Sequence, residues 1–173
     1  LETSLNNKKK IVQDYFRTII SRDISERYNL KNRTLLTDFI LYLLNSTNFS
    51  INKTVNVLRT QGRKVGKETI IKYAKYTEES YFCYFVPIFS YKIKDQLQYH
   101  KKVYFSDNSF ITNLSLRMSK NLGRLYENAV FLELKRRQSE NQLIEIFYWS
   151  DKNSEVDFVI KEGIKVKELI QVS

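Results

Sequence analysis

The sequence contains few of the residues that crosslink a chain or interrupt regular structure. Its 1 cysteine, Cys83, excludes a disulfide framework, and its 1 histidine, His100, argues strongly against a zinc site. With only 4 glycines and 1 proline in 173 residues, we expect mostly regular secondary structure. The chain also has no apolar run near the roughly 20 residues that cross a bilayer. Its first ten residues are polar, unlike a secretory signal, so we expect a cytoplasmic protein without membrane contact.

Positive charge is what the sequence has in excess. The 29 lysines and arginines outnumber the 19 acidic residues and give a formal net charge of +10. A charge of this size favours polyanionic partners, because lysine and arginine bind phosphates and release their counterions. We therefore expect DNA as the partner, although a basic surface can also serve solubility alone. The 42% of hydrophobic residues indicates an ordinary folded chain of one domain or two small ones.

Residues 1–90 have the pattern of a helical, winged-helix-like domain. Apolar residues at helical spacing predict helices over 9–28 and 32–44. Ser50 is placed to cap a third helix that ends near Gly62, and a fourth helix is expected over 67–79. An apolar strand is expected over 81–89. Two short helices joined by a glycine-containing turn and followed by a strand are typical of a winged helix.

Basic residues gather on the second helix of this pair and in the turn before it. A helix of this kind docks into the major groove or against the DNA backbone. The alternative is that these side chains are only the solvated face of a core helix, and the sequence leaves both open. The candidate nucleic-acid-binding residues are Arg63, Lys64, Lys67, Lys72 and Lys75.

Residues 91–173 change in character and form the second predicted domain. A strand is expected over 101–105, then a short helix over 110–114 and a long helix over 121–138. Three strands follow over 142–149, 155–160 and 164–172, the last two joined by a tight turn at Gly163. Helices followed by a strand meander predict an α+β architecture.

Two acids and an amide of this second half are candidates for one site. Glu127 lies on the long helix, while Asp157 and Gln171 lie on strands that bring them side by side if those strands pair. Oxygen ligands of this kind suit Mg²⁺ or Mn²⁺, which can activate water against a phosphodiester. Glu133 is the alternative acid of the helix, expected to be buried and paired with Arg137. All of these acids could instead be surface charges.

Two other motifs are rejected. The segment 62–69 contains two glycines and a lysine, but its spacing and the helix before it do not match a phosphate-binding loop. Cys83 and His100 do not make a nucleophile pair, because Cys83 lies in an aromatic strand where thiols are buried and inert.

An ordered set of short motifs resembles the carboxy-terminal region of a family of bacterial and archaeal AAA+ ATPases. The resemblance implies an ATPase module followed by a winged helix and a domain of unknown function with a restriction-endonuclease-like α/β fold and a small mixed sheet. It implies that this chain is a fragment, that ATP binds only in a missing amino-terminal module, and that this module is a partner in cis. The motifs are Arg22-Asp23-Ile24, Arg27-Tyr28, Phe49-Ser50, Lys102 to Asp107, Gly123 with Glu127-Asn128, Glu155 to Phe158, and Ile170-Gln171-Val172.

The resemblance assigns the helix glutamate of that family to Glu127 and its aspartate to Asp157. Family members with the full signature have glutamate, any residue and lysine on the last strand, where this chain has Gln171, Val172 and Ser173. Serine cannot hold the attacking water or stabilise charge on the phosphate as lysine does. A lysine from elsewhere, such as Lys135, could replace it.

The expected function is therefore an accessory region of an AAA+ ATPase that binds or positions DNA without cutting it efficiently. One alternative is an active nuclease that uses Mg²⁺ or Mn²⁺ with Glu127, Asp157 and Gln171. Another is a module that docks a protein partner of the ATPase, with the positive charge incidental.

Overall fold

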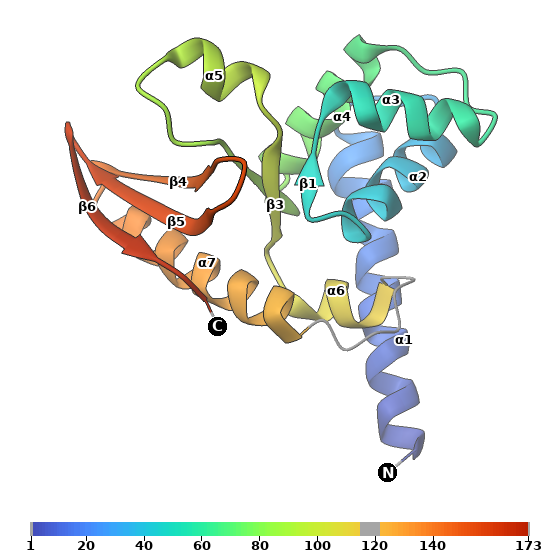
Figure 1. Cartoon of the computed structure of the whole chain (residues 1–173). Coiled ribbons are helices and arrows are strands. Elements are labelled where there is room, and N and C mark those ends of the chain that lie inside the picture. Colours follow the sequence, from blue (N-terminus) through green and yellow to red (C-terminus); the bar gives the residue numbers. More distant parts are fainter. Residues whose placement is uncertain (1, 115–121, 173) are drawn as a thin grey trace.

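The computed structural model describes residues 2–114 and 122–172, and its architecture confirms the predicted α+β class (Figure 1). Helices make up most of the first part, and a helix with a strand meander forms the second. In chain order the elements are α1 (Glu2–Thr18), the π-helix η1 (Ile19–Glu26), α2 (Arg33–Leu44), β1 (Asn48–Phe49), α3 (Ile51–Thr60), α4 (Lys67–Glu79), β2 (Cys83–Val86), α5 (Ile93–Gln98), β3 (Lys101–Phe105), α6 (Asn108–Leu114), α7 (Leu122–Glu140), β4 (Ile144–Ser150), β5 (Glu155–Glu162) and β6 (Lys165–Ile170).

The helices α2, α3 and α4 follow the prediction closely. The apolar stripe of α2 is buried along its whole length, because its residues recur at helical spacing on one face. Ser50 precedes α3 in extended conformation, although its side chain makes no capping hydrogen bond. Gly62 adopts φ +79° just after α3, a conformation that glycine adopts without strain, and it allows the tight turn into α4.

The first helix differs from its prediction. It begins at Glu2 and continues beyond Thr18 as the π-helix η1, where an α-helix was expected up to residue 28. Of the apolar residues at helical spacing in this segment, Ile19 and Ile20 are buried, whereas Ile11 and Tyr15 are exposed. Figure 1 shows the reason, because the amino-terminal turns of α1 extend beyond the other elements.

Strand β3 lies between two hydrophobic cores. It is the central strand of the antiparallel sheet β1-β3-β2. Since successive side chains of a strand point to opposite faces, Val103 and Phe105 enter the first core, with α2, α3 and α4. Tyr104 enters the second core, and Lys102 lies on the same side. Side chains of this one short strand therefore contribute to both hydrophobic cores.

The second core lies between α7 and the sheet β4-β5-β6 (Figure 1). Phe131 and Leu134 of α7 pack against residues of all three strands. Neighbouring strands of this sheet are antiparallel, and the parallel component of the predicted mixed sheet is a single bridge between Ile88 and Tyr148. The small element α5, in the connection between β2 and β3, was not predicted.

The face that α7 buries agrees only in part with the apolar stripe that helical spacing predicts. Leu125, Val130 and Leu132 of that stripe pack against the two cores, whereas Leu122 and Tyr126 are exposed. The helix buries Asn128, Phe131 and Leu134. The Asn128 side chain accepts a hydrogen bond from the Phe105 amide at 2.7 Å and donates to the Phe105 carbonyl at 2.9 Å. This polar contact joins the buried face of α7 to the end of β3.

Contacts also connect the two halves away from β3. Arg124 of α7 donates hydrogen bonds to the carbonyls of Leu44 and Ser46 at 2.7 and 2.9 Å, at the carboxyl end of α2. The pair β2–β3 lies on both sides of the expected domain boundary at residue 90. The division into residues 1–90 and 91–173 stays a prediction.

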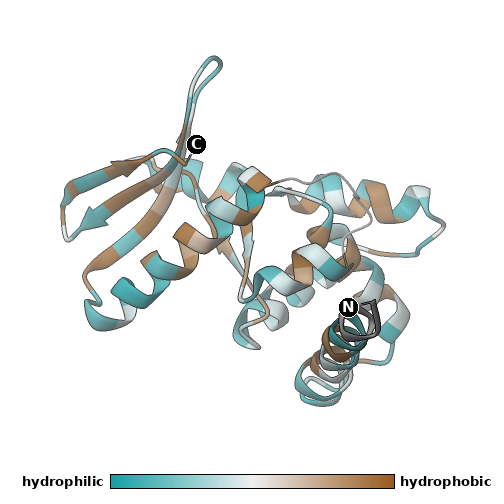
Figure 2. Cartoon of the chain, turned by 90° about the horizontal axis from the view of Figure 1, so that it is seen from below, coloured by the Kyte–Doolittle hydropathy of each residue, from teal (hydrophilic) through white to brown (hydrophobic). Residues whose placement is uncertain are grey.

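Hydrophilic and hydrophobic residues are interleaved along the helices and strands (Figure 2). Within residues 2–114 and 122–172 there is accordingly no helix with the length and apolarity that a bilayer crossing requires.

Candidate functional site

Three acidic side chains from two elements meet around one lysine from a third. Glu127 comes from the first half of α7, and Glu155 and Asp157 come from the start of β5. The two β5 residues are two positions apart, so the strand presents both on one face. Lys102 reaches the same place from β3.

The Lys102 ammonium contacts all three acids. Its Nζ lies 2.9 Å from Glu127 Oε1 and 2.9 Å from Asp157 Oδ1, and it also forms an ion pair with Glu155. Lys102 is only 6% exposed and Asp157 only 7%. Charged side chains this deeply buried are stable only when they are paired and hydrogen-bonded, as these are. We call Lys102, Glu127, Glu155 and Asp157 the lysine–acid cluster.

Neutral groups also donate hydrogen bonds to two acids of the cluster. The Tyr104 hydroxyl donates to Glu127 Oε1 at 2.5 Å. At the other end, Asp157 Oδ2 accepts from the Gln171 side-chain amide at 2.8 Å and from the Val172 backbone amide at 3.0 Å. Two negative charges remain after Lys102 is counted against three carboxylates. These neutral donors stabilise that charge.

Aromatic rings close one side of the cluster. Lys102 Nζ lies 5.8 Å from the centroid of the Tyr148 ring, within the range of a cation–π contact. The Tyr148 hydroxyl donates to the His100 carbonyl at 2.6 Å. Burial raises the pKa of Tyr148 to about 12, with a further contribution from the charge of Glu155. The phenol is therefore neutral at physiological pH.

Electrostatics keeps Lys102 protonated and Tyr104 neutral. Burial of the ammonium would lower the pKa of Lys102, but hydrogen bonds to Glu155 and Asp157 and the charge of Glu127 raise it above its ordinary value. Burial, followed by the negative charge of Glu127, raises the pKa of Tyr104 far above that of an ordinary phenol. The cluster consequently contains one fixed cation and a hydroxyl that only donates.

The cluster does not fit a divalent metal ion in this arrangement. Mg²⁺ binds oxygen at about 2.0–2.1 Å. The Glu127 and Asp157 oxygens instead surround Lys102 Nζ at 2.9 Å. Gln171 turns its amide nitrogen toward Asp157, and that nitrogen cannot ligate a cation. In the part of the chain that the structure describes, no group of three or more histidine, cysteine, aspartate or glutamate side chains is arranged to hold a metal.

The structure brings the predicted Glu127, Asp157 and Gln171 together, while their catalytic and metal-binding roles stay predictions. Ser173 lies outside the described residues. Lys102 was not among the predicted site residues, because the lysine of the site was expected on the last strand or from elsewhere, such as Lys135 of α7. Lys135 instead donates to Gln138 at 2.7 Å, and Lys167 pairs with Glu162 at 3.2 Å. The feature of the sequence that could have indicated Lys102 is its position directly before the apolar run 103–105.

The predicted burial of Glu133 is wrong. Its side chain is 43% exposed and pairs with Arg136 and with Arg137. Hydrogen bonds from these arginines lower the pKa of Glu133 to about 2. Since Phe131 and Leu134 occupy the buried face of α7, Glu133 between them points outward.

A second candidate region is the basic helix α4 with the turn before it. Lys64, Lys67, Lys72 and Lys75 are all exposed, as a DNA-binding helix requires. Lys75 lies 3.6 Å from Glu79 on the same helix. The predicted residue Arg63 is different, because its guanidinium pairs with Asp38 of α2 at 2.6 Å. Arg63 thus connects the turn to the core.

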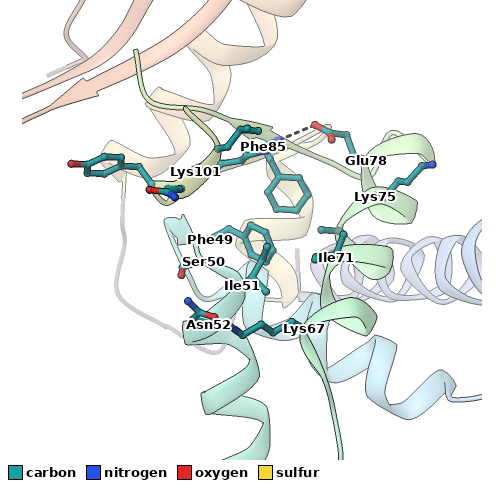
Figure 3. Close-up of a pocket in the computed structure, with 14 residues that line it drawn as sticks. Phe49, Ser50, Ile51, Asn52, Lys67, Ile71, Lys75, Glu78, Phe85 and Lys101 are labelled. Carbon is teal, nitrogen blue, oxygen red and sulfur yellow. Dashed lines mark hydrogen bonds between the residues drawn. The ribbon is translucent and has the colours of Figure 1, made fainter. Parts of the chain in front are cut away.

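A groove of about 740 Å³ lies beside α4, between this helix, the start of α3 and the sheet β1-β3-β2 (Figure 3). Phe49 and Phe85 form its floor and are mostly buried. On its sides Ile71 is 50% exposed and Leu97 is 72% exposed. Large aliphatic side chains facing one hollow are unusual on a surface that has no partner.

The charge of this groove is mainly positive. Lys67, Lys75 and Lys101 line it (Figure 3). The acidic side chain among the lining residues is Glu78, whose Oε1 accepts a hydrogen bond from the Phe85 amide at 3.2 Å. An acidic ligand would therefore meet complementary charge here.

Cys83 is fully buried, and burial raises the pKa of its thiol to about 12. A thiol that does not ionise is a poor nucleophile.

Two family models match consecutive parts of the chain. Residues 1–121 match domain of unknown function DUF8612, and residues 122–172 match domain of unknown function DUF4143. The boundary between the two matches lies just before α7. Lys102 thus falls in the first match, whereas Glu127, Glu155 and Asp157 fall in the second.

Two relatives are similar over nearly the whole chain. An uncharacterized protein of Methanocaldococcus jannaschii is 40% identical over 96% of this chain and 37% of its own length. An uncharacterized protein of Haemophilus influenzae is 24% identical over 92% of this chain and 39% of its own length. The chain thus spans less than half the length of either relative. No solved structure matches it significantly.

Proposed function

The chain belongs to the family of the domain of unknown function DUF8612, and we propose that it binds duplex DNA through the exposed lysines of α4 and of the turn before it. The main support for this proposal is the exposure of Lys64, in the turn between α3 and α4, and of Lys67 and Lys72, on α4. The net charge of the chain, +10, also favours a polyanionic partner. Helices in this position enter the major groove or contact the phosphate backbone. Arg63 is no longer part of the proposed surface, because it is paired with Asp38.

The proposal includes a role as an accessory region of an AAA+ ATPase. The ordered motifs that resemble the carboxy-terminal region of those ATPases support it. In that role this chain positions DNA, and ATP is bound by a module outside it.

Fluorescence anisotropy with a labelled duplex at increasing salt tests the proposal. We expect binding at low salt that weakens steeply, since each phosphate contact contributes about 0.9 to the slope of log K against log salt. Replacing Lys64, Lys67 and Lys72 by serine should reduce that slope by about 3. The matched control replaces Lys8, Lys9 and Lys10 of α1, which are equally exposed. An equal loss in both variants, or no binding by the native chain, would contradict the proposal.

The alternative of an active nuclease has less support from the geometry. A metal-dependent nuclease needs an open cation position among its acids, and here an ammonium lies between them. Incubation of plasmid DNA with Mg²⁺ or Mn²⁺ tests this alternative. Cleavage by the native chain that disappears in Asp157→Ala would establish it, and intact plasmid in both samples is the result we expect.

A second candidate function, docking of an acidic peptide, is favoured by the groove beside α4. Duplex DNA would use Lys67 and Lys75 but would leave Ile71 and Leu97 exposed. A peptide with acidic residues beside large apolar ones would cover all four. The buried faces of Phe49 and Phe85 offer little area for base stacking, so a single-stranded nucleic acid fits less well.

Peptide binding can be tested by NMR on the native chain. The probe is a synthetic peptide of alternating glutamate and leucine, with a lysine–leucine peptide as the matched control. We expect shifts of the Ile71 and Leu97 methyl signals with the acidic peptide alone. If neither peptide shifts these signals, or if both do so equally, peptide docking is rejected. If duplex DNA alone shifts them, DNA is the ligand of the groove.

A further inference from the structure

We infer that Lys102 is the resident cation of the lysine–acid cluster and occupies the place of a divalent ion. The cluster would then be a metal-free junction that joins the β1-β3-β2 sheet to α7 and β5. The inference concerns only this cluster and does not depend on DNA binding by α4.

The position of the Lys102 ammonium supports this inference. Lys102 Nζ lies 2.9 Å from one oxygen of Glu127 and 2.9 Å from one oxygen of Asp157, and it pairs with Glu155 as well. A hard cation bound by the three oxygens that contact Lys102 would lie at the same point, so the ammonium and such an ion exclude each other.

The strand and the side chains around Lys102 hold its ammonium among the acids. It lies on the central strand of its sheet, opposite Asn48 of β1 and Val86 of β2. Its side chain is buried, and its ammonium is beside the Tyr148 ring. A charged group fixed in place acts at an effective concentration far above that of an ion in solution. Withdrawal would also leave the ammonium without its three partners.

Neutral donors also form hydrogen bonds with oxygens of two of the acids. Glu127 Oε1 accepts from the Tyr104 hydroxyl as well as from Lys102. Asp157 Oδ2, which does not contact Lys102, accepts from Gln171 and Val172. Glu127 and Asp157 thus each accept from at least one neutral donor in addition to the ammonium, which leaves them less capacity to bind an added ion.

Binding of Mn²⁺, followed by electron paramagnetic resonance and by calorimetry, tests the inference. We expect no 1:1 binding by the native chain up to the highest Mn²⁺ concentration used. Lys102→Met, where three acids are left without their cation, should bind one Mn²⁺ with a dissociation constant at least about tenfold below that concentration. Adding Asp157→Asn to Lys102→Met should abolish this binding. Lys165→Met, which removes an exposed lysine of β6, should remain like the native chain.

Native binding as tight as that of Lys102→Met, or no such binding by Lys102→Met, would overturn the inference. If Lys102→Met does not fold without metal, recovery of its circular dichroism by Mn²⁺ supports the inference.

A measurement on the native chain covers the case in which the variant does not fold at all. The ¹⁵N signal of Lys102 Nζ should be unchanged when Mg²⁺ is added, because the ammonium stays among the acids. A shift of that signal that saturates at 1:1 would show displacement of the lysine and overturn the inference. The signal of an exposed lysine such as Lys165 provides the reference.

Discussion

The two cores of this protein are held together in different ways. The first core consists mainly of apolar side chains from α1, η1, α2, α3, α4, α6, β2 and one face of β3, and its buried polar groups are small, such as Thr54 and Thr77. The second core, between α7 and the sheet β4-β5-β6, has buried charges at its edge, Lys102 and Asp157. Apolar packing is non-directional, whereas buried charges require particular partners at particular distances. The second core therefore depends on a few specific pairs.

The largest effect is expected from a mutation in the first core. Phe39 of α2 is fully buried, and Phe39→Ala should lower the free energy of unfolding by about 3–5 kcal/mol. Because β3 belongs to both cores, the second core should lose the same stability. Circular dichroism reports the helices, and fluorescence of Trp149, the single tryptophan, reports β4. The two urea transitions should move together, and a fluorescence transition that stays in place would show that the cores unfold independently.

Lys102→Met should lower the free energy of unfolding by about 3 kcal/mol, since it leaves the buried Asp157 carboxylate and the partly buried Glu127 carboxylate without their cation. Urea denaturation of the variant measures this loss. The matched control, Lys165→Met on an exposed position of β6, should change stability by less than about 0.5 kcal/mol. Equal stability of the two variants would mean that the ion pairs of Lys102 add little and that apolar packing stabilises the second core, as it does the first.

Asn128→Ala should lower the free energy of unfolding by about 2 kcal/mol. The variant leaves the amide and the carbonyl of Phe105 without the partners that Asn128 provides. Asn113→Ala on α6 is the comparison, because the hydrogen bonds that the described residues give Asn113 lie within its own helix turn. A loss in Asn128→Ala no larger than in Asn113→Ala would contradict the role of this amide in orienting α7.

The smallest effect is a loss of stability at alkaline pH that originates in the second core. The pKa of Tyr148 is raised from 10.0 to about 12 in the folded state. The folded state thus holds the phenol proton more tightly, so this stabilisation is complete below pH 10 and disappears as pH rises to about 12. The midpoint of thermal unfolding should fall over that interval, and Tyr148→Phe should fall less steeply. A parallel fall in both proteins would assign the effect to other groups.

Much of the fold could be predicted from the sequence, because its elements have clear local patterns. The apolar stripe of α2, the start of α4 at Lys67 and the strand Lys101–Phe105 all agree with the structure. The buried face of α7 was predicted only in part, since it includes Asn128, a polar residue that bonds to β3 and that no apolar spacing indicates. Asp157 and Gln171 are close because β5 and β6 pair, as their alternation suggested.

The sequence by itself determined the helices and strands, the basic charge and the acidic residues that can share a site. These properties follow from spacing between near neighbours, which the chain displays directly. Tertiary structure alone decided which lysine joins the acids and which basic residue of the helix pair is already paired. Lys102 is 25 residues from Glu127 and 55 from Asp157, and Arg63 meets Asp38 of another helix. Such pairs arise from packing between distant segments, and no local periodicity specifies them.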